Sequence, residues 1–196
     1  MAHHPSRVLT TKQLLLVLAI FAGVVGGGIL MWNLWVSDSE KNNTINPTQE
    51  QLLQRLKRQM NHFIMRLSMD HGPNADVQRL VDRYRKTEFK MSAFPESYTL
   101  NKGERVSICL QDWKRETPSD RDFNLLVFVA LHELGHIMSV SEQHTPEFWK
   151  NFKFLLQEAT RYGMYDPVDY QKEPAFHCNV VVNENPYWEK PNQQRS

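Results

Sequence analysis

Two histidines and a glutamate have the spacing of a metal-dependent hydrolase. His132, Glu133 and His136 form the motif His-Glu-x-x-His. In a helix, residues four apart lie on one face one turn apart, so the two imidazoles can bind the same cation. Glu133 projects about 100° around the helix from His132, where it can reach a water on that cation without being a ligand. The motif therefore predicts a zinc site with Glu133 as the general base.

The residues before the motif favour a helix that ends in a metal site. Residues 123–131 are apolar, and Ser119 or Asp120, just after Pro118, can cap the first turn. A helix buried in a core does not normally carry unpaired histidine and glutamate side chains, because unpaired polar groups are costly to bury. The pattern thus favours metal ligands over histidines buried in an ordinary core.

The third ligand decides the type of site, because a catalytic zinc normally has three protein ligands and one open position. His144 follows His136 by eight residues and precedes Thr145-Pro146, which can open another helix. Phe148 and Trp149 are expected to pack against Leu131 and Leu134 and so fix His144. The alternative is a carboxylate on that following helix, Glu158. The extended metzincin pattern is absent, since Ser139 and Glu142 occupy its glycine and last histidine positions.

The sequence around the motif resembles a known family. His-Glu-Leu-Gly-His at 132–136, followed by His-x-x-x-Phe-Trp at 144–149, is similar to the WLM and SprT-like zinc metallopeptidases. The segments 151–159 and 165–170 resemble WLM-domain proteins of large DNA viruses, and the similarity extends from Tyr98 to Pro186. It implies a zincin-like fold, a protein or peptide substrate, and zinc ligands at His132, His136 and His144.

The rest of the chain is expected to supply helices and a small hairpin. Thr48 and Gln51 can form a capping box, and an apolar stripe at three- and four-residue spacing then runs to Gly72-Pro73. A shorter helix is expected over 77–84 and another from Pro146 to Gly163. Strands at 98–100 and 106–110, with Gly103 in the turn, predict a hairpin that either holds an extended substrate or simply covers the motif helix. The apolar stripe comprises Leu52, Leu53, Leu56, Met60, Phe63, Ile64 and Leu67.

The N-terminal region predicts a membrane anchor. Residues 14–36 contain no charged side chain and are long enough to cross a bilayer; a cleaved signal peptide is the alternative. Basic residues precede this span and acidic residues follow it, so the N-terminus (1–13) is expected in the cytosol and the remainder in a lumen or outside the cell. Small residues at Ala19, Gly23 and Gly27 could form a homodimer face. Residues 37–47 are a polar stalk with a glycosylation sequon at Asn42.

Cysteine content and charge bear on a possible disulfide and on the class of partner. Cys109 and Cys178 allow one pairing, which the sequence leaves open. The formal net charge is +1, and no concentrated basic stretch is evident, so a nucleic-acid partner is not expected.

Together these features predict an α+β protein. An N-terminal transmembrane helix would be followed by a helix-rich, zincin-like domain over 48–182, with a small hairpin and a polar tail over 183–196. The predicted function is a membrane-anchored zinc metallopeptidase. The alternatives are a non-catalytic membrane or virion protein stapled by zinc, and a tethered protease for DNA–protein crosslinks.

Overall fold

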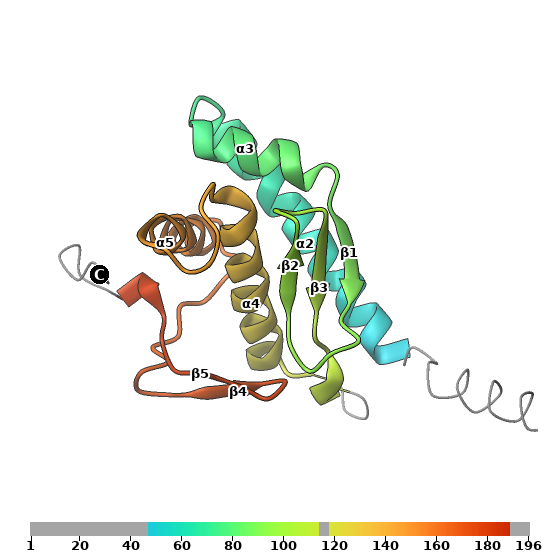
Figure 1. Ribbon diagram of the computed structural model, residues 1–196. Coiled ribbons are helices and arrows are strands. Elements are labelled where there is room, and N and C mark those ends of the chain that lie inside the picture. The colour runs from blue at the N-terminus through green and yellow to red at the C-terminus, as the bar shows by residue number, and fades with distance from the viewer. Residues whose placement is uncertain (1–46, 114–117, 189–196) are drawn as a thin grey trace, which may run out of the picture. The chain divides into compact units, whose positions relative to one another are not determined.

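The computed structural model describes residues 47–113 and 118–188, which belong to a compact unit spanning Asn46–Ser196. These residues form an α+β arrangement of four helices and two small sheets (Figure 1). The helices are α2 (Pro47–His71), α3 (Ala75–Tyr84), α4 (Asp120–Met138) and α5 (Pro146–Arg161). The strands are β1 (Glu88–Met91), β2 (Tyr98–Leu100), β3 (Arg105–Ile108), β4 (Ala175–His177) and β5 (Val180–Val182), with short 3-10 turns at Gln111–Trp113 and Pro186–Trp188.

The predicted hairpin is present and belongs to a larger sheet. β2 pairs antiparallel with β3, and Gly103 lies between them with φ of 107°. The sheet order is β1-β3-β2, in which β1 is an additional strand parallel to β3. Strand β1 was not predicted, because Glu-Phe-Lys-Met is too short to show a clear alternation. The order leaves β2 at one edge of the sheet, beside α4.

Helix α4 is the centre of the fold. Ser119 caps it in a capping box with Asp122, and thirteen of its residues are buried. Figure 1 shows α4 between the three-stranded sheet and α5. A helix that is apolar on most sides requires neighbours on most sides, and the sheet, α3 and α5 supply them.

Helix α2 buries the predicted apolar stripe. All seven stripe residues are less than 9% exposed, as expected for an amphipathic helix packed on a core. The helix is also fixed at both ends: Gln49 Nε2 donates to the Leu110 carbonyl at 2.6 Å, and His71 Nε2 lies 2.9 Å from Glu158 Oε2. Its two ends therefore contact the sheet side and the α5 side of the molecule.

The two cysteines form a disulfide, which answers the question left open by the sequence. Cys109 follows β3, and Cys178 lies in the turn between β4 and β5, 69 residues later in the chain.

The C-terminal segment is also held near its end. Asn185, placed in the polar tail by the sequence analysis, is buried and donates to Tyr165 Oη at 2.8 Å and to the Val168 carbonyl at 2.7 Å.

The expected architecture of a transmembrane helix followed by a zincin-like domain needs correction. Across residues 47–113 and 118–188, none of the helices combines the length and the apolar character needed to span a bilayer. The predicted span at 14–36, its homodimer face and the sequon at Asn42 all lie outside the described residues. The fold is therefore an α+β arrangement whose described helices all belong to the globular part.

Two glycines with positive φ give a test of the turn geometry. At Gly103 a Cβ atom would lie 3.0 to 3.3 Å from three Ile137 side-chain atoms, whereas at Gly163 (φ of 67°) no atom lies within 4 Å. We expect Gly163→Ala to lower the free energy of unfolding by about 1 kcal/mol, the cost of a left-handed conformation. Gly103→Ala should cost about 2–3 kcal/mol, because a contact with α4 is added to the backbone strain. Urea denaturation of both variants measures the difference, and equal losses would contradict this account.

Candidate metal centre

The structure brings three predicted ligands together. His144 Nε2 lies 3.0 Å from His132 Nε2, and His136 Nε2 lies 3.3 Å from the same atom. Three nitrogens bound at about 2.0–2.1 Å to one tetrahedral zinc ion lie about 3.3 Å apart, so the spacing fits that ion. All three donor atoms lie within 4.8 Å of one another. The group contains no fourth histidine, cysteine or carboxylate among the residues that the structure describes.

Hydrogen bonding between the rings does not account well for this arrangement. A neutral imidazole nitrogen carries either one N–H or one lone pair. His132 Nε2 is close to two other Nε2 atoms, so it would have to share a single hydrogen or a single lone pair between both. A cation accepts three lone pairs at once, and the donor set therefore fits a bound metal ion better than a hydrogen-bonded cluster.

The environment keeps the three imidazoles neutral. Burial, together with the charges of neighbouring histidines, lowers the pKa of His132 to about 3. Burial, the His144 charge and Lys102 lower the pKa of His136 to about 4. Burial also lowers the pKa of the more exposed His144. A neutral ring offers the lone pair that a metal ion requires.

Glu133 lies next to the histidines but is held by strand β2. Its side chain is only 4% exposed, and Thr99 Oγ1 donates to its Oε2 at 2.7 Å. Burial raises the pKa of Glu133 to about 7, even though the hydrogen bond from Thr99 lowers it. A carboxyl group with a pKa near neutrality can both accept and release a proton at physiological pH.

The ring of Phe148, at the start of α5, packs against all three imidazoles. Its centroid lies 4.9 Å from that of His132, 4.4 Å from that of His136 and 4.7 Å from that of His144. Gly135 permits this approach, because a Cβ atom there would lie 3.0 Å from Phe148 Cε2. The glycine inside the motif therefore has a packing role, and Phe148 fixes the ligands by direct contact.

The loop that carries His144 is held by side chains at both ends. Glu147 accepts hydrogen bonds from the backbone N–H groups of Val140 and Ser141, each at 2.8 Å. The Ser141 hydroxyl lies 2.5 Å from that of Thr145, which also caps α5. These contacts fold the chain back after α4 and bring His144 over the two helical histidines.

Basic side chains bind the carbonyl groups at the end of α4. Arg83 donates to the carbonyls of Ile137 at 2.8 Å and Ser139 at 2.9 Å, and Arg79 donates to that of Met138 at 2.7 Å. Lys102, in the β2–β3 turn, donates to the Ser141 carbonyl. The last carbonyls of a helix lack partners within the helix and attract cations, so these side chains stabilise the turn towards His144.

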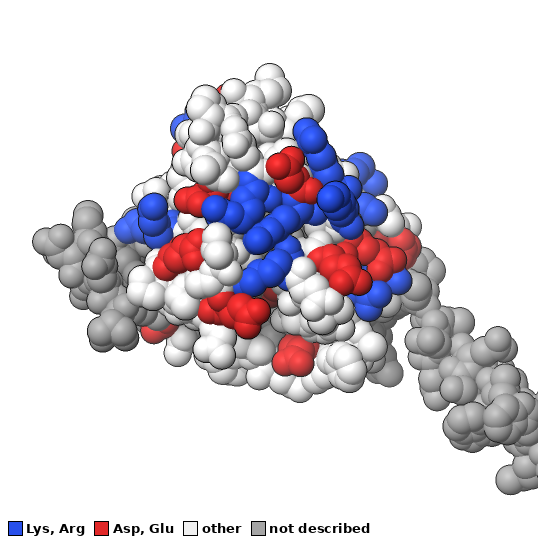
Figure 2. Space-filling view, turned by 45° about the horizontal axis from the view of Figure 1, so that its top comes forward, with Lys and Arg blue, Asp and Glu red and all other residues white. Residues whose placement is uncertain are grey.

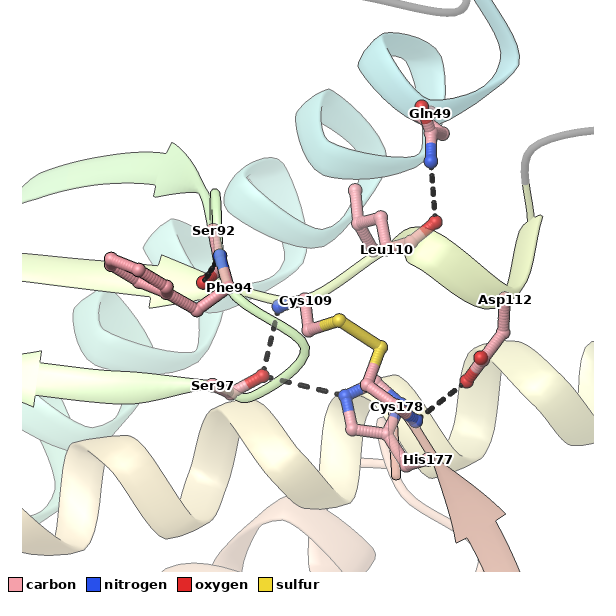
Figure 3. Close-up of a disulfide and its surroundings, with 9 residues drawn as sticks. All are labelled: Gln49, Ser92, Phe94, Ser97, Cys109, Leu110, Asp112, His177 and Cys178. Atoms are coloured by element: carbon pink, nitrogen blue, oxygen red, sulfur yellow. Dashed lines mark hydrogen bonds between the residues drawn. A yellow bond between two sulfur atoms is a disulfide. The ribbon is translucent and has the colours of Figure 1, made fainter. Parts of the chain in front are cut away.

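Two other candidate groups do not take part. Glu158, the alternative third ligand, pairs with His71 and with Arg161 on the α2 side of α5. Asp112, His177 and Cys178 also lie close together (Figure 3). However, the Cys178 sulfur is bonded to Cys109, and the Asp112 carboxylate accepts the Cys178 N–H at 2.7 Å. This second group is thus a structural contact.

Two cavities are lined by residues of the candidate metal centre. One, of about 380 Å³, is lined by polar residues that include Tyr98, Asn101 and Lys102. The other, of about 220 Å³, has mainly apolar walls. Ser97, His132 and Glu133 line both, so the candidate metal centre lies where the two cavities meet.

Some residues of the site were not predicted. Thr99 and Lys102 lie in the predicted hairpin. No local pattern indicated that Thr99 would contact Glu133 or that Lys102 would bind the turn after α4. Glu147 was not predicted either, because the N–H groups it binds belong to Val140 and Ser141, in the loop before its own helix. Among the aromatic residues of the C-terminal part, His177 lines the apolar cavity, whereas Tyr165 and Tyr170 are buried beside Phe128.

Comparison with known proteins finds viral relatives. Uncharacterized protein R325 of Acanthamoeba polyphaga mimivirus is 36% identical over 89 residues, which are 45% of this chain and 44% of that protein. Uncharacterized protein 136R of Invertebrate iridescent virus 6 is 37% identical over 90 residues, 46% of this chain and 50% of the relative. Uncharacterized protein 042R of Invertebrate iridescent virus 3 is 34% identical over 102 residues, 50% and 62% of the two chains. The chain thus spans about half the length of the curated relatives it matches. No protein-family model and no solved structure matches it.

Proposed function

We propose that the protein is a zinc-dependent peptidase in which His132, His136 and His144 hold the metal ion. The observation that carries this proposal is the convergence of three neutral imidazoles without a fourth ligand among the described residues. Structural zinc sites normally have four protein ligands, whereas catalytic sites have three and an open position.

Glu133 is the proposed general base. A bound zinc ion lowers the pKa of a coordinated water to about 7 and polarises a carbonyl group. Glu133 would take a proton from the attacking water and pass it to the leaving amine. Thr99 would orient the carboxylate through the hydrogen bond to its Oε2.

The proposed substrate is an extended polypeptide. β2 pairs on one side with β3 and forms an edge of the three-stranded sheet. An edge strand offers backbone donors and acceptors to a polypeptide that aligns with it. Thr99, in the middle of β2, contacts Glu133, so a polypeptide along this edge would pass the catalytic groups.

A zinc-stapled structural domain is the second candidate. It would be favoured by a fourth protein ligand supplied from residues outside the described ranges. X-ray absorption spectroscopy of the zinc-loaded protein distinguishes the two, because a fourth protein ligand would replace the water oxygen expected for a catalytic site.

Surface charge and the disulfide both bear on the substrate class. On the face drawn in Figure 2, Lys and Arg side chains gather near the centre, and Asp and Glu side chains surround them. Several basic side chains are paired, as in Arg79 with Asp76 at 2.8 Å. The Cys109–Cys178 disulfide is typical of an oxidising compartment. Both observations disfavour a DNA-dependent role in the nucleus.

The first prediction concerns the general base. Glu133→Gln should retain zinc and lower kcat/KM for a peptide substrate by about 10²–10⁴-fold, because the amide cannot take the proton. Glu173→Gln is the control, since Glu173 forms an exposed ion pair with Arg121. Zinc content by elemental analysis and cleavage of a quenched fluorescent peptide test both variants. Undiminished cleavage by Glu133→Gln would exclude the proposed role.

The second prediction concerns the loop that carries His144. Glu147→Gln should weaken zinc binding by about 10–100-fold, because the charged acceptor for two backbone N–H groups is lost. Glu104→Gln is the matched control, since Glu104 is an exposed carboxylate that accepts from Asn101 in the β2–β3 turn. Competition titration with a zinc-selective chelator measures the affinity. If both variants bind zinc as the parent does, Glu147 does not position the ligand.

The third prediction is a pH dependence. Burial would raise the pKa of Glu147, but hydrogen bonds from Ser141 and Val140 lower it from 4.5 to about 2. A depressed carboxyl pKa contributes stability above the unfolded value, and this contribution is lost as the pH falls through the folded value. In metal-free protein, the parent should be more stable than Glu147→Gln near neutral pH. This difference in the free energy of unfolding should shrink as the pH falls from 4.5 to about 2. Urea titrations at several pH values measure it, and a constant difference would contradict the hydrogen bonding.

A further inference from the structure

We propose that the apolar cavity beside His132 and Glu133 receives one bulky apolar side chain of the substrate, and that the disulfide-bound β4–β5 hairpin forms its outer wall. The inference rests on the proposed peptidase function for its catalytic consequence. It concerns substrate preference, which neither the motif nor the metal site determines.

The walls of the cavity are suited to an apolar side chain. α4 contributes Phe128 and Val129, α5 contributes Trp149 and Phe152, and β5 contributes Val180 and Val182. Burial of an apolar side chain among such groups is favourable in proportion to the area removed from water. The volume of about 220 Å³ admits one large side chain rather than a stretch of polypeptide.

The cavity is continuous with the catalytic groups. His132, Glu133 and Ser97 line this cavity and also the polar cavity. A substrate along β2 would therefore place neighbouring residues in environments of opposite character. One side of the cleaved bond would be apolar, whereas the other would lie near Lys102 and Asn101.

The outer wall is a hairpin with few internal supports. β4 and β5 form a separate two-stranded sheet, and such a hairpin is only marginally stable in isolation. Its two turn residues, Cys178 and Asn179, have φ of 45° and 68°, values that residues other than glycine rarely adopt. Phe176 is 75% exposed and Val180 is 50% exposed, so the hairpin is covered on only part of its surface.

Contacts at the turn hold this wall in place (Figure 3). Cys178 is bonded to Cys109, and its N–H donates to Asp112 Oδ2 at 2.7 Å. His177 Nε2 lies 3.3 Å from Ser97 Oγ, which in turn accepts the Cys109 N–H at 2.9 Å. The hairpin is therefore fixed to the segments that flank β2 and β3, and the disulfide is the covalent part of that attachment.

Substrate preference tests the proposal. Quenched peptides that differ by Phe, Glu or Gly at one position on either side of the cleaved bond give a ratio of kcat/KM values. The parent should prefer Phe over Gly by about tenfold or more on one side. Val180→Glu should abolish that preference, measured as the ratio of kcat/KM values for the Phe and Gly peptides. Phe176→Glu is the matched control on the same hairpin, since Phe176 does not line the cavity, and it should keep the preference.

The disulfide is tested with Cys109→Ala/Cys178→Ala. This double variant should retain bound zinc and cleavage of the Gly peptide and lose the Phe preference, because the wall is no longer pinned. A parent protein that cleaves peptides without apolar preference on either side would overturn the subsite and leave the peptidase proposal standing.

Binding provides a readout that does not depend on catalysis. Addition of N-acetyl-phenylalanine amide to isotope-labelled protein should shift the methyl resonances of Val129, Val180 and Val182, whereas N-acetyl-glycine amide should not. Absence of these shifts would overturn the proposal. Shifts without hydrolysis of any peptide would support the apolar site and refute the peptidase.

Discussion

The packing of Phe148 against three imidazoles is the contact on which the metal centre depends. Histidine side chains from a helix and from a loop converge only if something fills the space beneath them, and the Phe148 ring lies within 4.9 Å of each imidazole centroid. Gly135 makes room for that ring. The motif and the first turn of α5 are thus one packed unit. The positions of the ligands follow from the approach of α4 and α5.

The strands and helix ends around this unit supply polar contacts that apolar packing cannot. The turn after α4 exposes carbonyl groups, and Arg79, Arg83 and Lys102 bind them from α3 and from the β2–β3 turn. Glu147 binds the N–H groups of the same turn. On the other side of the centre, β2 presents Thr99 to Glu133. The sheet therefore orients the carboxylate, and the charged side chains order the loop.

Sequence reasoning was most reliable where the signal was local. The apolar stripe of α2, a cap of α4 at Ser119 or Asp120 and the proline start of α5 each depend on residues within a few positions. The stripe and the proline start are present, and the structure assigns the cap to Ser119. The disulfide and β1 could not be derived in this way. Pairing of Cys109 with Cys178 depends on how residues 69 positions apart meet, and β1 is a strand only because β3 lies beside it.

For the candidate centre, the motif indicated His132, Glu133 and His136, and the spacing to Thr145-Pro146 suggested His144. Packing of Phe148 beside the motif was predicted, but its contact with all three imidazoles was not. The contact of Thr99 with Glu133 was not predictable, because it joins residues 34 positions apart in the chain. The expected membrane helix is a different case. Its evidence was strong within the sequence, but it concerned residues outside the described ranges, while the described helices all serve the globular part.

The three ligands come from one short stretch that begins at His132 and ends at His144. Closing a short segment on itself requires little loss of chain entropy compared with joining distant parts of a chain. The conformation of this stretch therefore depends mainly on the contacts that α3, β2 and α5 make with it. Exchange of surface residues elsewhere should leave the ligand spacing unchanged, whereas an insertion of a single residue between Ser139 and Thr145 would displace the third imidazole directly.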